Sequence, residues 1–285
     1  MGDAKVIGIC AVGTYYPLWF KWTIASIYNA VDEIIVVNGG LDIKNPDLNE
    51  TEVPLEQVSK DIDKLDVDGK IIEITDFSKL KCRLTLTTQY EANKRNLPAW
   101  YDLRGRNLTL ANEVAVDRGA DFILKIDSDQ CCYFDVLDVR DEKAALVFYQ
   151  YEFAGSIGET GYLLYPPPNS PFNDSVFTYP AKESQFYFGG GAPVIGVYRE
   201  PTYKYHAAHL RYAYPEWMPE DEVLKYMYGR MWFVYYTNEG LWGDELEKKA
   251  MSAAKDALNR EVMSTAPSPE VVRYRNPVEY IEVTR

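Results

Sequence analysis

Short apolar runs alternate with amphipathic segments in the first quarter of the chain, and this alternation constrains the fold more than any other feature. The expected strands cover residues 5–12, 33–37 and 70–74. The first intervening segment carries a stripe of Phe20, Ile24, Ile27 and Val31, and the second carries Leu55, Val58, Ile62 and Leu65. Such stripes predict helices that bury one face. Because single helices are the usual crossovers between parallel strands, the sequence predicts an α/β fold.

A fourth strand is expected at residues 121–126, after a helix over about residues 107–118. It runs directly into Asp127-Ser128-Asp129. Residues two apart in a strand point the same way, so the two carboxylates converge if the extended geometry persists. Two close negative charges repel each other unless a positive charge lies beside them. The pattern therefore predicts a divalent cation, Mn2+ or Mg2+, at Asp127 and Asp129.

The second half of the chain has a different organisation. Strands are expected at about residues 144–152 and 193–198, with a loop-rich stretch between them. From about residue 220 onward two segments have helical patterns, and the tail has one expected strand at residues 278–283. The sequence therefore predicts one large domain over residues 1–218, followed by a helical C-terminal extension and tail over residues 219–285.

The composition of the chain excludes some classes of function. Acidic residues outnumber basic ones by 43 to 30, which gives a net charge of −13. A sequence-independent grip on nucleic acid depends on clustered Lys and Arg, so we expect no nucleic-acid partner. The chain shows neither a signal-peptide pattern nor an apolar run of about 18 residues, which predicts a cytoplasmic protein. The four cysteines lack metal-finger or CxxC spacing, and free thiols fit a reducing compartment.

Polar or flexible residues follow three of the expected strands. They are Gly13-Thr14, Asn38-Gly39 and Asp127-Ser128-Asp129. Ligands of open parallel sheets bind beyond the carboxyl ends of the strands, so we expect these three ends to face one crevice. Such a crevice suits a nucleotide, with strand ends for base and ribose. A carboxylate-held Mg2+ or Mn2+ would then contact the diphosphate.

Two stretches, VIGICAVGTYYPLWFKWTIASIYNAVDEIIVVNGG and RGRNLTLANEVAVDRGADFILKIDSDQ, resemble the donor-binding half of the GT-A-fold glycosyltransferases, specifically family 2. The resemblance covers roughly residues 5–135. It implies a GT-A, Rossmann-like fold with a mostly parallel central sheet flanked by helices. Residues 1–135 would form the nucleotide-sugar-binding half and residues 136–218 the acceptor half. The implied activity is transfer of a hexose from a nucleotide-diphosphate sugar to an acceptor, with inversion.

The resemblance also implies roles for individual residues. Asp127 would lie near the ribose and the metal, Asp129 would bind the metal, and Arg106 would lie close to the nucleotide. The full expected donor-binding set is Val12, Gly13, Thr14, Asn38, Asp76, Arg106, Asp127, Ser128 and Arg211. The chain departs from the family in two places. The second strand ends in Asn38 where the family more often has aspartate, and residues 77–103 have no counterpart and could form a lid or an acceptor contact.

The chain has two histidines, His206 and His209, in the motif HAAH. GT-A enzymes often take a further metal or diphosphate contact from a histidine after the acceptor strand. If the motif is helical, the two residues share one face. We expect His209 to be a metal ligand and Arg211 to neutralise the leaving diphosphate. His206 is the alternative ligand, and a surface histidine pair is the alternative without a function.

An inverting transferase needs a general base that takes the proton of the acceptor hydroxyl. Glu183, just before QFYFGGG, and Asp221, within the run Glu220-Asp221-Glu222, are the candidates. The acidic run also suits a helix N-terminus, because acids there face the positive end of the helix dipole.

The acceptor could be a glycan, a lipid-linked molecule or a small molecule. The aromatic stretch MWFVYY, residues 231–236, could pack inside the domain, form a homodimer contact or touch a membrane surface. Two other functions are compatible with the pattern. One is a nucleotidyltransferase on a Rossmann-like sheet, although the Gly-rich basic loop expected after its first strand is missing. The other is a non-catalytic sugar-nucleotide-binding protein.

Overall fold

The computed structural model describes residues 4–12, 18–38, 56–76, 99–133, 146–157, 163–164, 177–180, 185–186, 193–194, 202–215, 217–259 and 272–273. Its largest sheet has the strand order β3-β2-β1-β4-β8-β6-β11-β5. The first four are parallel: β3 (Ile71–Ile74), β2 (Glu33–Asn38), β1 (Val6–Val12) and β4 (Phe122–Asp127). The sheet continues through β8 (Phe177–Pro180), β6 (Leu146–Ile157), β11 (Thr202–Pro215) and β5 (Gln130–Tyr133).

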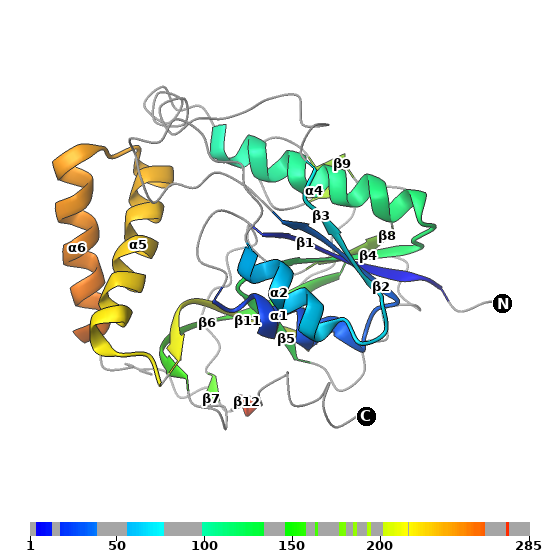
Figure 1. Cartoon of the computed structure of the whole chain (residues 1–285), viewed down its shortest axis with the longest axis horizontal. Helices are drawn as coiled ribbons and strands as arrows, with labels where there is room; N and C mark the ends of the chain where they lie inside the picture. The colour runs from blue at the N-terminus through cyan, green and yellow to red at the C-terminus, as the bar shows by residue number, and fades with distance from the viewer. Residues whose placement is uncertain are drawn as a thin grey trace.

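Helices cover both faces of the parallel strands (Figure 1). On one face lie α1 (Phe20–Tyr28) and α2 (Glu56–Leu65), which pack against Cys10 and Val36 among others. On the other face lies α4 (Ala99–Asp117), which packs against Ile9 and Ile35 among others. Alternate residues of each strand thus enter different cores. Burial on both faces explains why these strands are continuous apolar runs in the sequence.

The structure confirms the predicted α/β class. A mostly parallel sheet lies between helices, and two further helices come after the strands of this sheet in the sequence. Phe20, Ile24 and Ile27 of the predicted apolar stripe are buried in α1, and Val31, which follows the helix, is buried as well. Gly119 follows α4 with a φ of +80°, a left-handed conformation that suits glycine. Two helix boundaries differ from the sequence prediction. Helix α1 ends at Tyr28, so Val31 lies beyond it. Helix α4 begins at Ala99, so Arg106 lies inside the helix and not at its start.

The HAAH motif is not helical. It lies within the strand β11, whose backbone pairs with β5 on one side and with β6 on the other. Residues of a strand alternate between its two faces with a period of two. His206 and His209 are three positions apart, so a strand gives no reason to place both on one face. The register with β6 shifts between His209 and Tyr212, which marks an irregularity directly after the second histidine.

Two helices follow β11, as expected from the sequence. They are α5 (Glu220–Glu239) and α6 (Gly243–Asn259), which lie side by side next to one end of the large sheet (Figure 1). Gly240 ends α5 with a φ of +64°. Residues from both helices share a small core with residues that precede α1 and end β11: Met218, Val223, Tyr226, Met227 and Ala254, with Leu18 and Tyr214 packed against them.

The remaining strands are short. β9 (Gln185–Phe186) pairs with β10 (Pro193–Val194), and β7 (Leu163–Leu164) pairs with β12 (Val272–Arg273). The first of these pairs includes the beginning of the strand predicted at residues 193–198. The strand predicted at residues 278–283 and most of the segment 77–103 lie outside the described residues.

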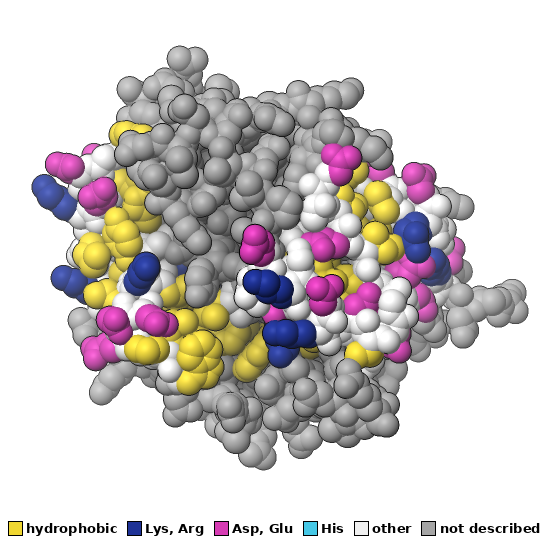
Figure 2. Space-filling model, in the orientation of Figure 1, with side chains coloured by type: hydrophobic (Ala, Val, Ile, Leu, Met, Phe, Trp, Pro, Cys, Tyr) yellow, Lys and Arg dark blue, Asp and Glu magenta, His cyan; other side chains and the backbone are white. Residues whose placement is uncertain are grey.

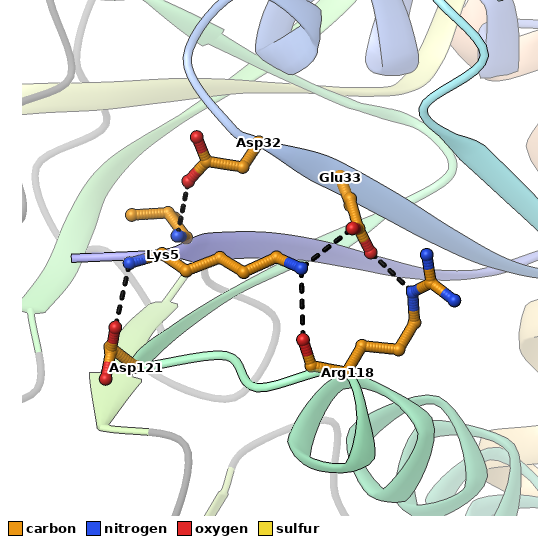
Figure 3. Close-up of polar contacts among 6 residues, drawn as sticks. Lys5, Asp32, Glu33, Arg118 and Asp121 are labelled. Atoms are coloured by element: carbon orange, nitrogen blue, oxygen red, sulfur yellow. Dashed lines mark hydrogen bonds and ion pairs between the residues drawn. The ribbon is translucent and has the colours of Figure 1, made fainter. Parts of the chain in front are cut away.

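Polar contacts tie the starts of three parallel strands to the end of α4 (Figure 3). The Lys5 ammonium group donates to Glu33 at 2.7 Å and to the carbonyl oxygen of Arg118 at 3.0 Å. The Lys5 backbone N–H donates to Asp121 at 2.9 Å, and the guanidinium of Arg118 donates to Glu33. Asp32 accepts a hydrogen bond from the backbone N–H of Val6, the first residue of β1, at 2.7 Å. This edge of the sheet is therefore held by its own charged residues.

In the space-filling view, charged side chains of both signs are interleaved over the described surface (Figure 2). Hydrophobic side chains gather near the N-terminal end of α5 (Figure 2). Trp217, which precedes α5, is 69% exposed. Of the aromatic stretch 231–236, Trp232 is buried, and Met231 packs against the core of the C-terminal helices. Among the described residues, no helix is both long enough and apolar enough to span a membrane.

Candidate functional site

The carboxyl ends of the parallel strands lie at one edge of the sheet, as the sequence predicts. Backbone pairing places Val12 of β1 beside Asn38 of β2, and Ala11 of β1 beside Asp127 of β4. Asp76 follows β3, the next strand in the sheet, and is exposed. The edge is the one opposite to the Lys5 contacts. It therefore gathers four of the residues expected to bind the donor.

The acidic motif forms a turn between two strands. Strand β4 ends at Asp127, and β5 begins at Gln130. The Gln130 side chain is fully buried, and its Oε1 accepts the backbone N–H of Asp127 at 2.8 Å. The Leu210 N–H of β11 donates to the Asp129 carbonyl oxygen at 2.7 Å. The extended geometry does not continue through the motif, so strand alternation does not set the direction of Asp129.

Asp127 has a cation of its own. The Nζ of Lys125 lies 2.9 Å from Asp127 Oδ1, and the Lys125 side chain has no exposed surface. The two residues are two positions apart in β4 and therefore share the face on which Ile123 packs toward α4. A buried ammonium is costly unless an opposite charge lies beside it. Lys125 and Asp127 thus balance each other's charge inside the fold.

Asp129 has different partners, which come from the second half of the chain. Arg230 of α5 donates from Nη2 to Asp129 Oδ2 at 2.6 Å. The same oxygen lies 3.4 Å from Nε2 of His209, whose side chain is 2% exposed. The Arg230 guanidinium also lies over the ring of Tyr226, 5.9 Å from its centroid. The turn, β11 and α5 therefore meet at one carboxylate oxygen.

Two neighbouring groups have raised pKa values. Burial raises the pKa of the Tyr226 hydroxyl, while the positive charge of Arg230 opposes part of this rise. Burial also raises the pKa of the Cys132 thiol well above its ordinary value, and the neighbouring Cys131 adds to the effect. Both groups are therefore protonated at neutral pH, and Cys132 is not an activated nucleophile. Cys10, Cys131 and Cys132 are buried and form no disulfide bond.

The described side chains do not fit a divalent cation as they are arranged. In the part of the chain that the structure describes, no group of three or more His, Cys, Asp or Glu residues is placed to hold a metal ion. An oxygen of Asp129 and a nitrogen of His209 would suit Mn2+, but the oxygen already accepts from Arg230. The requirement for Mn2+ or Mg2+ therefore stays a prediction.

The other expected site residues fall in three groups. Gly13, Thr14 and Glu183 lie outside the described residues. Arg106 and Arg211 lie within α4 and β11, but the structure describes only their backbone. The remaining three are placed in full, and they are described next.

Asn38 is fully buried, and its amide donates to Glu73 and, at 3.2 Å, to the Ser59 hydroxyl. Ser128 is half-buried in the acidic turn. Asp221 is exposed in the first turn of α5, which begins after Pro219 and carries acids at its first three positions. This placement matches the helix-dipole alternative, and it leaves the role of general base untested.

Sequence analysis missed the two cations of this site. Lys125 interrupts an apolar strand, and Arg230 interrupts the apolar stretch MYGRMWF, so each is a charge in a segment that otherwise predicts burial. Such a charge needs a buried partner. That signal was available in the sequence, but it does not say which carboxylate is the partner.

Comparisons with known proteins give little beyond this geometry. No protein-family model matches the chain, and no curated protein matches it. Among solved structures, the chain is similar to a protein assigned as a glucose-1-phosphate thymidylyltransferase from Bacillus anthracis, in complex with sucrose. The identity is 10% and the TM-score is 0.31, over 62% of this chain and 72% of that one. A similarity this distant carries no argument about activity.

Proposed function

We propose that the chain is a glycosyltransferase that moves a hexose, with inversion, from a nucleotide-diphosphate sugar to an acceptor. One observation supports the proposal most. The turn with Asp127 and Asp129 lies at the edge where the four parallel strands end, which is where ligands of such sheets bind. The buried cations beside both carboxylates fix the turn in this position.

The acceptor side would be supplied by the second half of the chain and by the C-terminal helices. His209 and Arg230 already reach the acidic turn from these elements. Asp221 and Glu183 are the proposed general bases. Asp221 precedes Arg230 by nine positions in α5, which corresponds to about 13 Å along the helix axis. Asp221 would therefore act on an acceptor that lies well away from Asp129.

The second candidate is a nucleotidyltransferase, the activity assigned to the Bacillus anthracis protein. The two reactions have different products. Sugar transfer releases a nucleoside diphosphate, whereas nucleotidyl transfer joins a nucleoside triphosphate to a sugar phosphate and releases pyrophosphate. A third candidate, a non-catalytic sugar-nucleotide-binding protein, would release neither.

The test is a panel of nucleotide sugars, and of nucleoside triphosphates with sugar phosphates, in parallel samples with Mn2+ and with a chelator. We expect at least one nucleotide sugar to raise the melting temperature, because ligands that bind the native state stabilise it. We expect phosphorus NMR to show slow release of the nucleoside diphosphate. Asp127→Asn should abolish both effects, whereas Asp63→Asn, on the exposed side of α2, should change neither.

Two outcomes would contradict the proposal. Pyrophosphate as the product would establish the second candidate. A panel in which no nucleotide or nucleotide sugar shifts the melting temperature would remove all three candidates, since each of them requires binding at this edge.

A further inference from the structure

We propose that Arg230 is the built-in counter-ion of Asp129, and that it occupies on this carboxylate the place that the sequence pattern predicts for a divalent cation. The native protein would then hold no divalent ion at Asp129. The inference rests on contacts within the chain. It does not depend on which reaction the site performs.

The first support is the geometry of Asp129. Its Oδ2 accepts from Arg230 Nη2 at 2.6 Å and lies 3.4 Å from His209 Nε2. The exposed fraction is 18% for the Asp129 side chain and 10% for the Arg230 side chain. Charge-assisted bonds of this length are among the stronger ones in proteins, and little water competes here. A metal ion on this oxygen would lie beside the guanidinium, and the two positive charges would repel each other.

The second support is the place of Arg230 in α5. The arginine lies over the buried Tyr226 ring, and Tyr226 belongs to the core that joins α5 and α6 to the residues around α1 and β11. The buried Tyr226 ring limits the space that the largely buried arginine can enter if it leaves Asp129. The contact is therefore a fixed part of the packing.

The third support is the second carboxylate of the motif. Asp127 Oδ1 lies 2.9 Å from Lys125 Nζ, so the other expected ligand is paired with a cation as well. Two carboxylates with one cation each carry no net charge. The repulsion between carboxylates that motivated a metal in the sequence argument is thus offset by Lys125 and Arg230.

The test is titration of the full-length protein with Mn2+ alone, followed by calorimetry and by the loss of the free-ion electron paramagnetic resonance signal. We expect no saturable binding by the native protein up to about 1 mM, the weak end of the affinities of protein cation sites. Arg230→Met should create a Mn2+ site at least about tenfold tighter than any native binding, because it leaves Asp129 as an uncompensated carboxylate beside His209.

Three further variants separate this role from a purely structural one. Arg230→Lys keeps the positive charge and should bind no Mn2+. The double variant Arg230→Met with Asp129→Asn should lose the new site, because it removes the oxygen ligand. Lys225→Met removes a cation from the exposed face of the same helix and should behave like the native protein.

Saturable Mn2+ binding by the native protein that Asp129→Asn abolishes would overturn the inference. This measurement needs no folded Arg230 variant. A folded Arg230→Met protein that gains no Mn2+ site would overturn it as well. A nucleotide sugar that binds the native protein only with Mn2+ bound at Asp129 would overturn the inference and leave the proposed function intact, whereas equal binding in a chelator would support both.

Discussion

At the scale of single residues, the acidic turn is shaped by charge balance. Lys125 and Asp127 form a pair within one strand, whereas Asp129 pairs with Arg230, which is 101 positions away in the chain. Removing one partner of a buried pair typically costs about 3 to 5 kcal/mol, because the other charge stays buried without compensation. Each pair therefore depends on both of its members, and a change to any of the four side chains affects the turn.

His209 is the residue for which the site makes the sharpest functional prediction. His209→Ala should lower turnover at least about tenfold, because the imidazole is buried beside Asp129 and its loss disturbs the group that faces the substrate edge. His206→Ala should change turnover much less, since an odd spacing in a strand separates the two positions. The measurement is turnover of the nucleotide sugar identified by the panel, alongside the melting temperatures.

Equal losses of turnover in both histidine variants would contradict the prediction. A large fall in the melting temperature of His209→Ala alone would show that this histidine serves packing. His209→Gln, which keeps a polar side chain beside Asp129, is the matched variant and should lose less turnover than His209→Ala.

At the scale of elements, the two edges of the parallel sheet have different tasks. At the amino-terminal edge, Lys5, Glu33 and Arg118 join β1, β2 and the end of α4. At the carboxyl edge, two ion pairs surround the turn between β4 and β5: Lys125 with Asp127, and Asp129 with Arg230 of α5. Loss of contacts at the first edge should therefore change stability without changing ligand binding.

The pH dependence of stability provides a test of the Glu33 contacts at the amino-terminal edge. The hydrogen bond from Arg118, with a smaller contribution from Lys5, lowers the pKa of Glu33 below its ordinary value of 4.5, against the effect of burial. The stability that this pair contributes is therefore present above pH 4.5 and is lost as the pH falls through the lowered pKa. Because Arg118 is largely exposed, screening keeps the contribution below about 1 kcal/mol.

We accordingly expect Glu33→Gln to lower the melting temperature at pH 7, and we expect the difference from the native protein to narrow as the pH falls below 4.5. Glu113→Gln changes an exposed residue of α4 and is the control. It should not lower the melting temperature at any pH in the measured range. The measurement is thermal unfolding by circular dichroism between pH 3 and pH 7. A difference in melting temperature that grows as the pH falls would contradict this prediction.

At the scale of the whole molecule, the C-terminal helices are joined to the sheet. Met218, Tyr226 and Met227 share a core with Leu18 and Tyr214, which lie before α1 and near the end of β11. The predicted division at residues 218 and 219 therefore separates segments that are packed together.

A chain that ends at residue 218 should consequently fail to fold into a stable unit. It would lose the apolar cover of this core and would leave Asp129 without Arg230. We expect urea unfolding of the truncated chain to be broad and to begin in low denaturant, compared with a sharp transition of the full chain. A sharp transition at the same midpoint would show that residues 219–285 are an independent extension.

The local sequence determined most of the first half of the fold. Apolar runs and 3.6-residue stripes predicted β1, α1, β2, α2, β3 and β4, because these elements are buried by the same pattern that forms them. The strand ends at one edge also followed from the sequence, since parallel strands with single crossovers must end together. The start of α4 did not, because no strong cap marks residue 107 and the helix continues through residues 99–106.

Only the tertiary structure decided what surrounds the acidic turn. The shared face of the two histidines depended on HAAH being helical, yet HAAH lies in a strand. The tyrosines at 203, 205, 212 and 214 include the period-two spacing of a strand, and pairing with β5 and β6 fixes this conformation. The sequence shows that Arg230 is a charge in the apolar stretch MYGRMWF, but its partner depends on how α5 packs against the sheet. A contact across 101 positions is set by that packing, and no local pattern encodes it.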